Sequence, residues 1–191
     1  MINWKEIWEI HSPHFKNGYG IVPLTKDLSF RLVPGPGFGD LSHPTTNLVL
    51  DFLKPLVMGK IVIDIGCGSG ILSIAAALLG AKAVFAFEID EDSIHHAEEN
   101  FKLNGLEIFL NKTPPAVDLV TINMISSEQR LALEQYSFIK KFPHTLLTSG
   151  LLKKEKNAYL KEMDDWELVY EHSKGEWLGL NLFFSNHSFN R

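Results

Sequence analysis

Short apolar runs and stretches with helical spacing of apolar residues alternate along the middle of the chain. The runs predict buried strands at 61–65, 83–87, 106–110, 117–123 and 145–149. The stretches between them predict helices at 71–79, 91–104 and 127–139, and Gly80 and Gly105 stand where two of these helices should end. Alternating strands and helices are typical of a parallel sheet with helices on both faces.

The last part of the chain follows a different pattern. A helix is predicted over 154–163, after which apolar and polar residues alternate over 166–172 and again over 176–184. Lys174 and Gly175 supply the turn between these two segments. This pattern predicts an antiparallel hairpin that closes one edge of the sheet.

The first part of the chain is less regular. Helical spacing of Trp4 and Trp8 predicts a short amphipathic helix, and residues 28–33 predict a strand. Residues 34–46 are rich in Gly and Pro and predict a loop that is long enough to form a flap over a ligand. The helix that follows is expected to stop before Pro55.

A glycine-rich turn, Gly66-Cys67-Gly68-Ser69-Gly70, follows the strand at 61–65. Glycines let the backbone turn sharply without a Cβ between it and a ligand, and the helix that begins there should offer unpaired N–H groups. The spacing G-x-G-x-G, with Asp64 just ahead of it, differs from the dinucleotide fingerprint G-x-G-x-x-G. Glu88 ends the next strand, where a carboxylate can accept hydrogen bonds from both hydroxyls of a ribose.

These residues resemble the first motifs of the class I methyltransferases that use S-adenosylmethionine (SAM). A closer resemblance is to the methyltransferases of ribosomal protein L11. It is carried by Phe38-Gly39, His43, Thr45-Thr46, residues 63–81, Glu88-Ile89-Asp90, Glu99-Asn100, Asn104-Gly105, residues 123–125, Ser149-Gly150 and Glu176-Trp177. The resemblance implies a Rossmann-like, mostly parallel sheet of seven strands, with helices on both faces and the C-terminal hairpin antiparallel.

The resemblance also implies SAM as the cofactor and the amino groups of a protein as methyl acceptors. It would place Thr45, Gly66, Glu88 and Asn123 against the cofactor. Together with the turn and its neighbours, the candidate cofactor-binding residues are Thr45, Thr46, Asp64, Gly66, Gly68, Gly70, Glu88, Ile89 and Asn123.

Three departures from the family pattern affect these expectations. The family carries an additional N-terminal domain that captures the substrate, and we see no room for it before the Gly/Pro loop; we expect residues 1–42 to pack on a methyltransferase domain at 43–191, as one domain overall. Asp40 and Leu41 replace a Thr and a Gly of the family's loop, which predicts a stiffer and more acidic loop. The segment after the third strand is short, so that Asn111 or Thr113 could supply the adenine-side contact.

The candidate catalytic residues are Asn123 and His43. Asn123 ends the fourth strand, where its amide and backbone carbonyl could hold an amine. The sequence Asn-Met-Ile-Ser at 123–126 lacks the Pro-Pro and aromatic residue of many enzymes that methylate bases or amides, which disfavours those substrates. A lysine or N-terminal amine must lose a proton before attack, and His43 or Asp40 could receive it.

Composition narrows the class of partner. The formal net charge of −5 gives no basic footprint for nucleic acid, and the most apolar stretch, 71–79, is too short to span a bilayer. No secretory signal is visible, and the single cysteine, Cys67, suits a reducing cytoplasm. His11 and His14 lack companion ligands, and His95 and His96 are expected on the surface, so no metal site is predicted.

The sequence therefore predicts a cytoplasmic SAM-dependent methyltransferase that acts on a protein amino group. Two alternatives remain: methylation of a small-molecule amine, or a SAM-binding module without turnover. The acceptor and the oligomeric state do not follow from the sequence.

Overall fold

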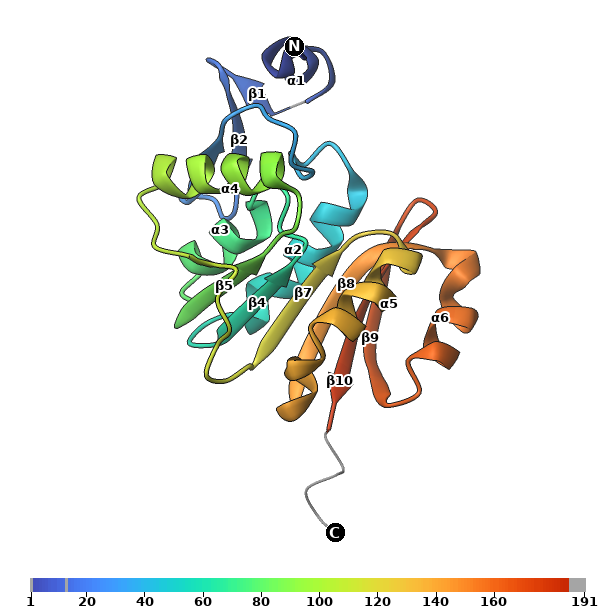
Figure 1. Ribbon diagram of the computed structural model, residues 1–191. Coiled ribbons are helices and arrows are strands. Elements are labelled where there is room, and N and C mark those ends of the chain that lie inside the picture. Colours follow the sequence, from blue (N-terminus) through green and yellow to red (C-terminus); the bar gives the residue numbers. More distant parts are fainter. Residues whose placement is uncertain (1, 13, 186–191) are drawn as a thin grey trace.

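A seven-stranded sheet forms the centre of the computed structural model, which describes residues 2–12 and 14–185 (Figure 1). Its strands are β4 (Ile61–Ile65), β5 (Ala83–Phe87), β6 (Phe109–Leu110), β7 (Leu119–Asn123), β8 (His144–Leu152), β9 (Trp166–Lys174) and β10 (Trp177–Phe184). They lie in the order β6-β5-β4-β7-β8-β10-β9. The first five are parallel, and β10 runs antiparallel between β8 and β9. The predicted α/β fold and its hairpin are confirmed.

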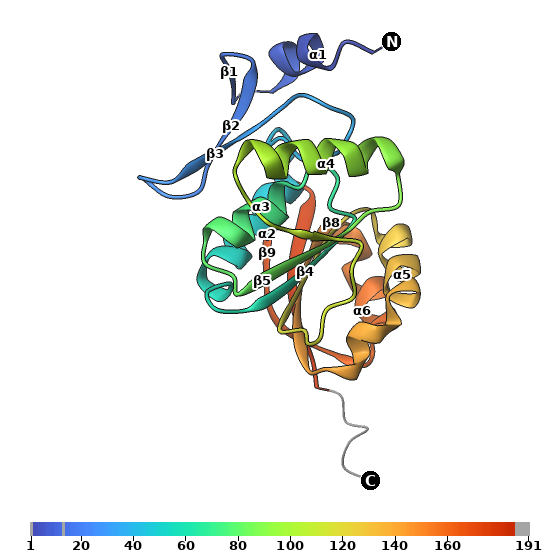
Figure 2. The ribbon, with the colours of Figure 1, turned by 60° about the vertical axis from the view of Figure 1, so that its left-hand side comes forward.

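Helices cover both faces of this sheet. On one side lie α2 (Pro44–Leu56), α3 (Ile71–Leu78) and α4 (Glu91–Leu103), and on the other lie α5 (Ser126–Gln135) and α6 (Lys156–Glu162) (Figures 1 and 2). Short 3₁₀ turns, η1 (Ser137–Lys141) and η2 (Lys153–Glu155), accompany α5 and α6. Neighbouring strand residues serve opposite cores: Val62 packs with α2 and α3, whereas Ile63 packs with α5 and α6. The strands are therefore apolar on both faces, as their sequence pattern indicates.

Several boundaries differ from the predicted ones for local reasons. Leu106 does not join the sheet, because its N–H donates to the carbonyl of Phe101 at 3.0 Å and closes the C-terminus of α4, so that β6 has only two residues. The prediction that α2 stops before Pro55 is wrong. Pro55 lies in the last turn, where its missing N–H breaks one bond and Val57 still donates to Leu53 at 3.1 Å.

The N-terminal part forms a small unit beside α4 (Figure 2). The predicted helix is α1 (Trp4–His11), and a three-stranded antiparallel sheet follows it, made of β1 (Phe15–Lys16), β2 (Tyr19–Pro23) and β3 (Ser29–Leu32). Only β3 had a clear sequence signal. Trp8 is buried against β2, where an added Cβ on Gly20 would lie 2.7 Å from its ring. None of the helices in the described part of the chain has the length and apolar character needed to cross a membrane.

The central position of β10 can be tested with Leu180, which is fully buried between β8 and β9 in the core that α5 and α6 cover. We expect Leu180→Ala to lower the free energy of unfolding by about 3 kcal/mol, because it leaves a cavity in a close-packed core. Urea unfolding measures this value. Val169→Ala, at a position of β9 that is 59% exposed, is the control and should change it by less than about 0.5 kcal/mol. Similar effects of the two substitutions would contradict the topology.

Candidate active site

A cavity of about 620 Å³ lies at the carboxyl ends of the parallel strands, beside the point between β4 and β7 where the strand order reverses. Such crevices are the usual ligand sites of open α/β sheets, and this volume is typical of a site for a small molecule. The lining residues are Phe38, His43, Thr45, Ile65, Gly66, Phe87, Glu88, Ile89, Asn123, Met124, Ile125, Glu128, Leu131, Ala132, Gln135, Tyr136, Gly150 and Trp177.

The glycine turn reaches the cavity through Gly66, and its three glycines have positive φ. A Cβ on Gly66 would lie 2.0 Å from Cε of Met124, and one on Gly68 would lie 2.6 Å from the carbonyl oxygen of Phe38. Each N–H from Gly66 to Ile71 already has an acceptor within the protein. The N–H groups of the turn itself are therefore used within the protein, and the turn contributes shape instead of donors.

The carboxylate of Glu88 faces the cavity from the end of β5 and is held by backbone N–H groups. One oxygen accepts from Ile89 at 2.8 Å and Asp90 at 3.1 Å, and the other accepts from Gly68 at 3.0 Å. A carboxylate has about four lone-pair sites, so one remains for a ligand hydroxyl, and a second ligand bond requires the release of an N–H. The amide of Asn111 bonds the backbone of Glu88: its Oδ1 accepts from the N–H at 3.1 Å, and its Nδ2 donates to the carbonyl at 3.0 Å. Neither Asn111 nor Thr113 lines the cavity.

Asp64 lies beneath the turn and does not line the cavity. Its two carboxylate oxygens accept hydrogen bonds from Ser73 Oγ at 2.6 Å and Thr121 Oγ1 at 2.8 Å. Burial disfavours the charged form and raises the pKa of Asp64 to about 6, although these two bonds oppose the shift. Asp64 can therefore act on a ligand only through its charge and through the turn that it supports.

Asn123 reaches the cavity from the end of β7. Its Nδ2 donates to Thr46 Oγ1 at 3.2 Å, whereas its Oδ1 is buried and has no hydrogen-bond partner among the described residues. A buried acceptor without a partner destabilises a protein by about 1–3 kcal/mol, so such atoms often mark places where a ligand binds. Thr46 itself is fully buried and lies behind Asn123.

His43 caps the N-terminus of α2 and stands between two aromatic rings. Its Nδ1 lies 2.8 Å from Thr45 Oγ1 and accepts from the N–H of Thr45 at 3.4 Å. Phe38 and Trp177 contact the imidazole edge to face, with centroid distances of 5.7 and 4.7 Å. Burial lowers the pKa of His43 and outweighs the opposing effect of the Asp40 charge. The ring is therefore neutral and ordered at neutral pH.

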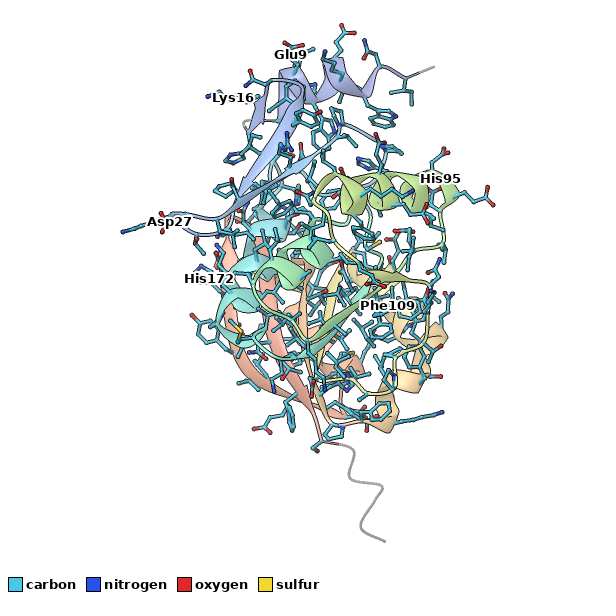
Figure 3. The ribbon with its side chains drawn as sticks, turned by 90° about the vertical axis from the view of Figure 1, so that its left-hand side faces the viewer. Glu9, Lys16, Asp27, His95, Phe109 and His172 are labelled. Atoms are coloured by element: carbon cyan, nitrogen blue, oxygen red, sulfur yellow. The ribbon has the colours of Figure 1, made fainter. Side chains whose placement is uncertain are left out.

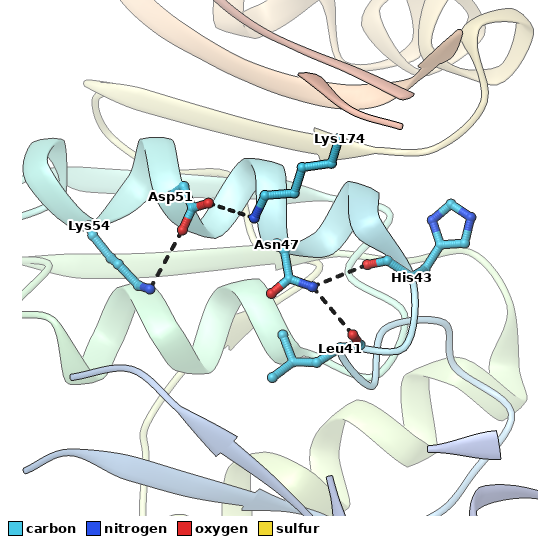
Figure 4. A network of polar contacts seen from close by, with 6 residues as sticks. All are labelled: Leu41, His43, Asn47, Asp51, Lys54 and Lys174. Carbon is cyan, nitrogen blue, oxygen red and sulfur yellow. Dashed lines mark hydrogen bonds and ion pairs between the residues drawn. The ribbon is translucent and has the colours of Figure 1, made fainter. Parts of the chain in front are cut away.

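The loop before α2 is held by its own polar contacts (Figure 4). The amide of Asn47 donates to the carbonyls of Leu41 at 3.3 Å and His43 at 3.5 Å. Leu41 has φ +69°, a conformation that favours glycine, and its side chain is buried. The carboxylate of Asp40 accepts from the N–H and the hydroxyl of Ser42, and neither Asp40 nor Leu41 lines the cavity. These contacts brace the loop against the start of α2.

The histidine pair of α4 is divided between surface and interior. His95 points outward from α4 (Figure 3) and is exposed, as predicted. The prediction that His96 also lies on the surface is wrong. Its ring is buried and bonded to the backbone of Val33 and Gly37, because the N-terminal unit covers this face of the helix. Among the described residues there is no group of three or more His, Cys, Asp or Glu that could hold a metal ion.

The cavity brings together six of the ten predicted site residues: His43, Thr45, Gly66, Glu88, Ile89 and Asn123. The other four, Thr46, Asp64, Gly68 and Gly70, support them from behind. Sequence reasoning did not select the α5 residues Glu128, Leu131 and Gln135 or the adjoining Tyr136, because an amphipathic helix gives no signal for the part of its polar face that borders a cavity. Phe38 was visible only as a member of a family motif, whereas Trp177 was also a candidate for lining a substrate groove, with a core position as the alternative.

The sheet order and the cavity at the switch point define a protein with the class I methyltransferase fold. The sequence profile of the family described as ribosomal protein L11 methyltransferase (PrmA) matches residues 15–183. The chain belongs to this family. A solved structure of ribosomal protein L11 methylase from Lactobacillus delbrueckii subsp. bulgaricus superimposes with a TM-score of 0.71 at 27% identity, covering 86% of this chain and 98% of that chain.

The curated relatives are longer than the region that matches this chain. Ribosomal protein L11 methyltransferase of Thermoanaerobacter pseudethanolicus is 32% identical over 93% of this chain, and that of Geobacter sulfurreducens is 35% identical over 92%. The chain spans 64% of the length of each. At the level of fold alone, it resembles a Pyrococcus abyssi tRNA (uracil-54, C5)-methyltransferase solved with S-adenosyl-L-homocysteine (SAH), with a TM-score of 0.60 and 17% identity; 90% of this chain and 45% of that chain are covered.

The environment of Asp64 predicts a pH-dependent effect of Asp64→Asn. Because the folded-state pKa is raised, Asp64 contributes most to stability below its unfolded pKa of about 4 and least above pH 6. The substitution removes a buried charge that exists only at high pH. The free energy of unfolding of the variant relative to wild type should therefore rise by about 3 kcal/mol from about pH 4 to about pH 8.

Chemical denaturation at several pH values measures this difference. Asp27→Asn is the control, because Asp27 projects from the turn between β2 and β3 into solvent (Figure 3) and should leave the pH profile unchanged. A profile for Asp64→Asn that runs parallel to wild type would show that the carboxyl is not protonated in the folded protein near pH 5.

Proposed function

We propose that this protein is a SAM-dependent methyltransferase that methylates an amino group of a protein, on a lysine side chain or at an N-terminus. The observation that carries the proposal is the buried Oδ1 of Asn123, which lacks a partner in a cavity at the switch point of the sheet. Nδ2 already donates to Thr46, whereas Oδ1 has no partner among the described residues, so Oδ1 is the acceptor that this amide offers to a ligand. An amine N–H is a suitable donor to it.

The residues present fit SAM better than a phosphate-bearing cofactor. Every N–H of the turn is used within the protein, and two carboxylates, Asp64 and Glu88, lie beside it. This arrangement repels a phosphate, whereas Glu88 can accept a ribose hydroxyl. Support also comes from the family match and from structural neighbours solved with SAH. When bound, SAM supplies an activated methyl group, and the protein supplies orientation and electrostatics.

The acceptor amine would enter on the side of the cavity where Asn123 meets the aromatic residues. Phe38 and Ile125 are each 52% exposed and line the cavity, so they offer apolar surface to the alkyl chain of a lysine. The amine must be neutral to attack, and an oxygen acceptor such as Asn123 Oδ1 orients it through its N–H. Orientation of this kind can lower a barrier by several kcal/mol, about 7 in favourable cases.

His43 is the candidate for receiving the proton of the amine. In the tautomer that caps α2, Nδ1 accepts from Thr45 and the ring proton is on Nε2. His43 can therefore take up a proton only at Nδ1, after it releases Thr45. The carboxylate of Glu128 also lines the cavity and offers a second route to solvent.

Methylation of a small-molecule amine and SAM binding without turnover remain the alternatives. Identification of the labelled acceptor separates the first from protein methylation, and any catalysed transfer excludes the second. We also propose the cytoplasm as the site of action, where the one cysteine, Cys67, would remain a reduced, buried thiol.

Glu88→Ala should weaken SAH binding by tenfold or more, because it removes the cavity's ribose acceptor and releases the N–H of Gly68. Calorimetric titration of purified protein with SAH measures the affinity. Glu91→Ala removes an exposed carboxylate from the first turn of α4 and should leave the affinity unchanged within about twofold. Equal affinities of the two variants would remove Glu88 from the cofactor site.

Asn123→Ala should slow methyl transfer by about a hundredfold while SAH affinity changes much less, because the oxygen orients the acceptor. Transfer of labelled methyl groups from SAM to proteins of a cell extract is measured, and the modified residue is identified by mass spectrometry. Asn123→Asp keeps an acceptor oxygen and should retain more activity than the alanine variant. Equal losses of affinity and transfer would make Asn123 a cofactor residue only, and label confined to small molecules would contradict a protein substrate.

A further inference from the structure

Three polar side chains on one face of α4 bind the backbone of the N-terminal unit and of the Gly/Pro loop. His96 and Asn100 belong to α4, Asn104 caps it, and the three stand four residues apart, so they line up along the helix. Asn104 bonds both the N–H and the carbonyl of Arg31, at 3.1 and 2.7 Å. Asn100 accepts from the N–H of Val33 at 2.8 Å. The row thus takes the place of a neighbouring strand for the free edge of β3 and for the backbone that follows it.

His96 forms the last contact of this row. Its Nε2 lies 2.7 Å from the carbonyl oxygen of Val33, and its Nδ1 accepts from the N–H of Gly37 at 3.1 Å. Both bonds exist together only in the neutral tautomer that carries its proton on Nε2, since a proton on Nδ1 would face the N–H of Gly37. The space is also tight, because a Cβ on Gly35 would lie 2.4 Å from the ring.

Ser69 of the glycine turn joins the same network from the other side. Its carbonyl accepts from Nδ2 of Asn100 at 2.8 Å. Its N–H donates to the carbonyl of Phe38 at 2.9 Å, and its hydroxyl donates to the carbonyl of Gly39 at 2.6 Å. The loop, the turn and α4 therefore form one closed ring of hydrogen bonds, which is buried at His96, Asn100 and Ser69.

We infer that His96 and Asn100, neither of which lines the cavity, are positioning residues that hold the Gly/Pro loop against the cofactor turn and thereby set cofactor affinity. The inference rests on the proposed function. The loop carries Phe38 and His43 into the cavity, and its backbone also completes the hydrogen bonding of the turn. A loop that is already ordered need not lose that freedom when the cofactor binds, which favours binding.

Substitutions at His96 test the inference against a matched control. His96→Leu removes both bonds, whereas His96→Gln keeps one donor and one acceptor at similar separation. Asn104→Ala breaks a clamp of the same construction that holds Arg31 but touches neither the loop nor the turn. SAH titration near pH 8 should show about tenfold weaker binding for His96→Leu and changes within twofold for the other two. Thermal unfolding of each variant reports its effect on folding.

A pH series supplies a readout that a purely structural residue would not change. Burial lowers the pKa of His96, against the opposing effects of the Val33 carbonyl and the nearby Glu99, so the neutral ring prevails at neutral pH. As pH falls below about 6.5 toward this lowered value, protonation should open the loop and weaken SAH binding to wild type. Trp8 packs on the ring and does not titrate in this range. Asp64 and His43 titrate in wild type and in His96→Gln alike. If SAH affinity depends less on pH in His96→Gln than in wild type, the difference is due to His96.

Hydrogen exchange gives a second measurement that does not depend on a ligand. The amide hydrogens of Gly37 and Ser69 should exchange faster in His96→Leu than in wild type. In Asn104→Ala their exchange rates should equal those of wild type. If wild type and both His96 variants bind SAH with the same affinity and the same pH profile, the inference is overturned and the proposed function stands. Wild type that binds neither SAM nor SAH would contradict the proposed function. In that case, unaltered exchange in His96→Leu would also show that His96 does not position the loop.

Discussion

The close approach of two backbone segments at the glycine turn is the constraint on which the rest of the site depends. A Cβ on Gly37 would lie 2.5 Å from the backbone of Gly68, and one on Gly68 would meet the backbone of Phe38. Only glycine allows the two segments to come this close, so that Ser69 of the turn can donate hydrogen bonds to the carbonyls of the loop. The loop can then bring Phe38 and His43 to the same cavity as Glu88, which lies at the end of a strand some distance along the chain. The cavity is therefore built from chain segments that lie far apart in the sequence.

Electrostatics follow from the same meeting point. The helix after a glycine turn normally attracts anions, but here Glu88 and backbone carbonyls already occupy the N–H groups of the turn, and Asp64 adds a buried carboxylate below. The local field is therefore more negative than the fold alone suggests. Such a field suits a cationic ligand and opposes a phosphate, which agrees with the glycine spacing that separates this turn from a dinucleotide fingerprint.

The fold could be predicted from the sequence because its signals are local. Apolar runs such as 61–65 and glycine helix ends such as Gly105 carry the information in a few neighbouring residues. The site could be predicted only in part, because its arrangement depends on contacts between distant segments. His96 was predicted on the surface because its burial depends on the N-terminal unit, which is distant in sequence. No local pattern shows that Glu88 and Ser69 accept hydrogen bonds from N–H groups at the turn. Buried polar contacts between distant residues leave no periodic signal.

The structure changes how the loop's departure from its family pattern is interpreted. Asp40 and Leu41 replace a Thr and a Gly in the loop that is expected over the methyl group, and in the sequence this change favours the alternative of a SAM-binding module without turnover. Leu41 occupies the left-handed conformation that a glycine would adopt without strain. Burial of its side chain in the core that α2 and α3 cover offsets this strain. The carboxylate of Asp40 accepts hydrogen bonds from Ser42. The two substitutions therefore alter how the loop is braced, and because neither residue lines the cavity, they give no ground for a loss of catalysis.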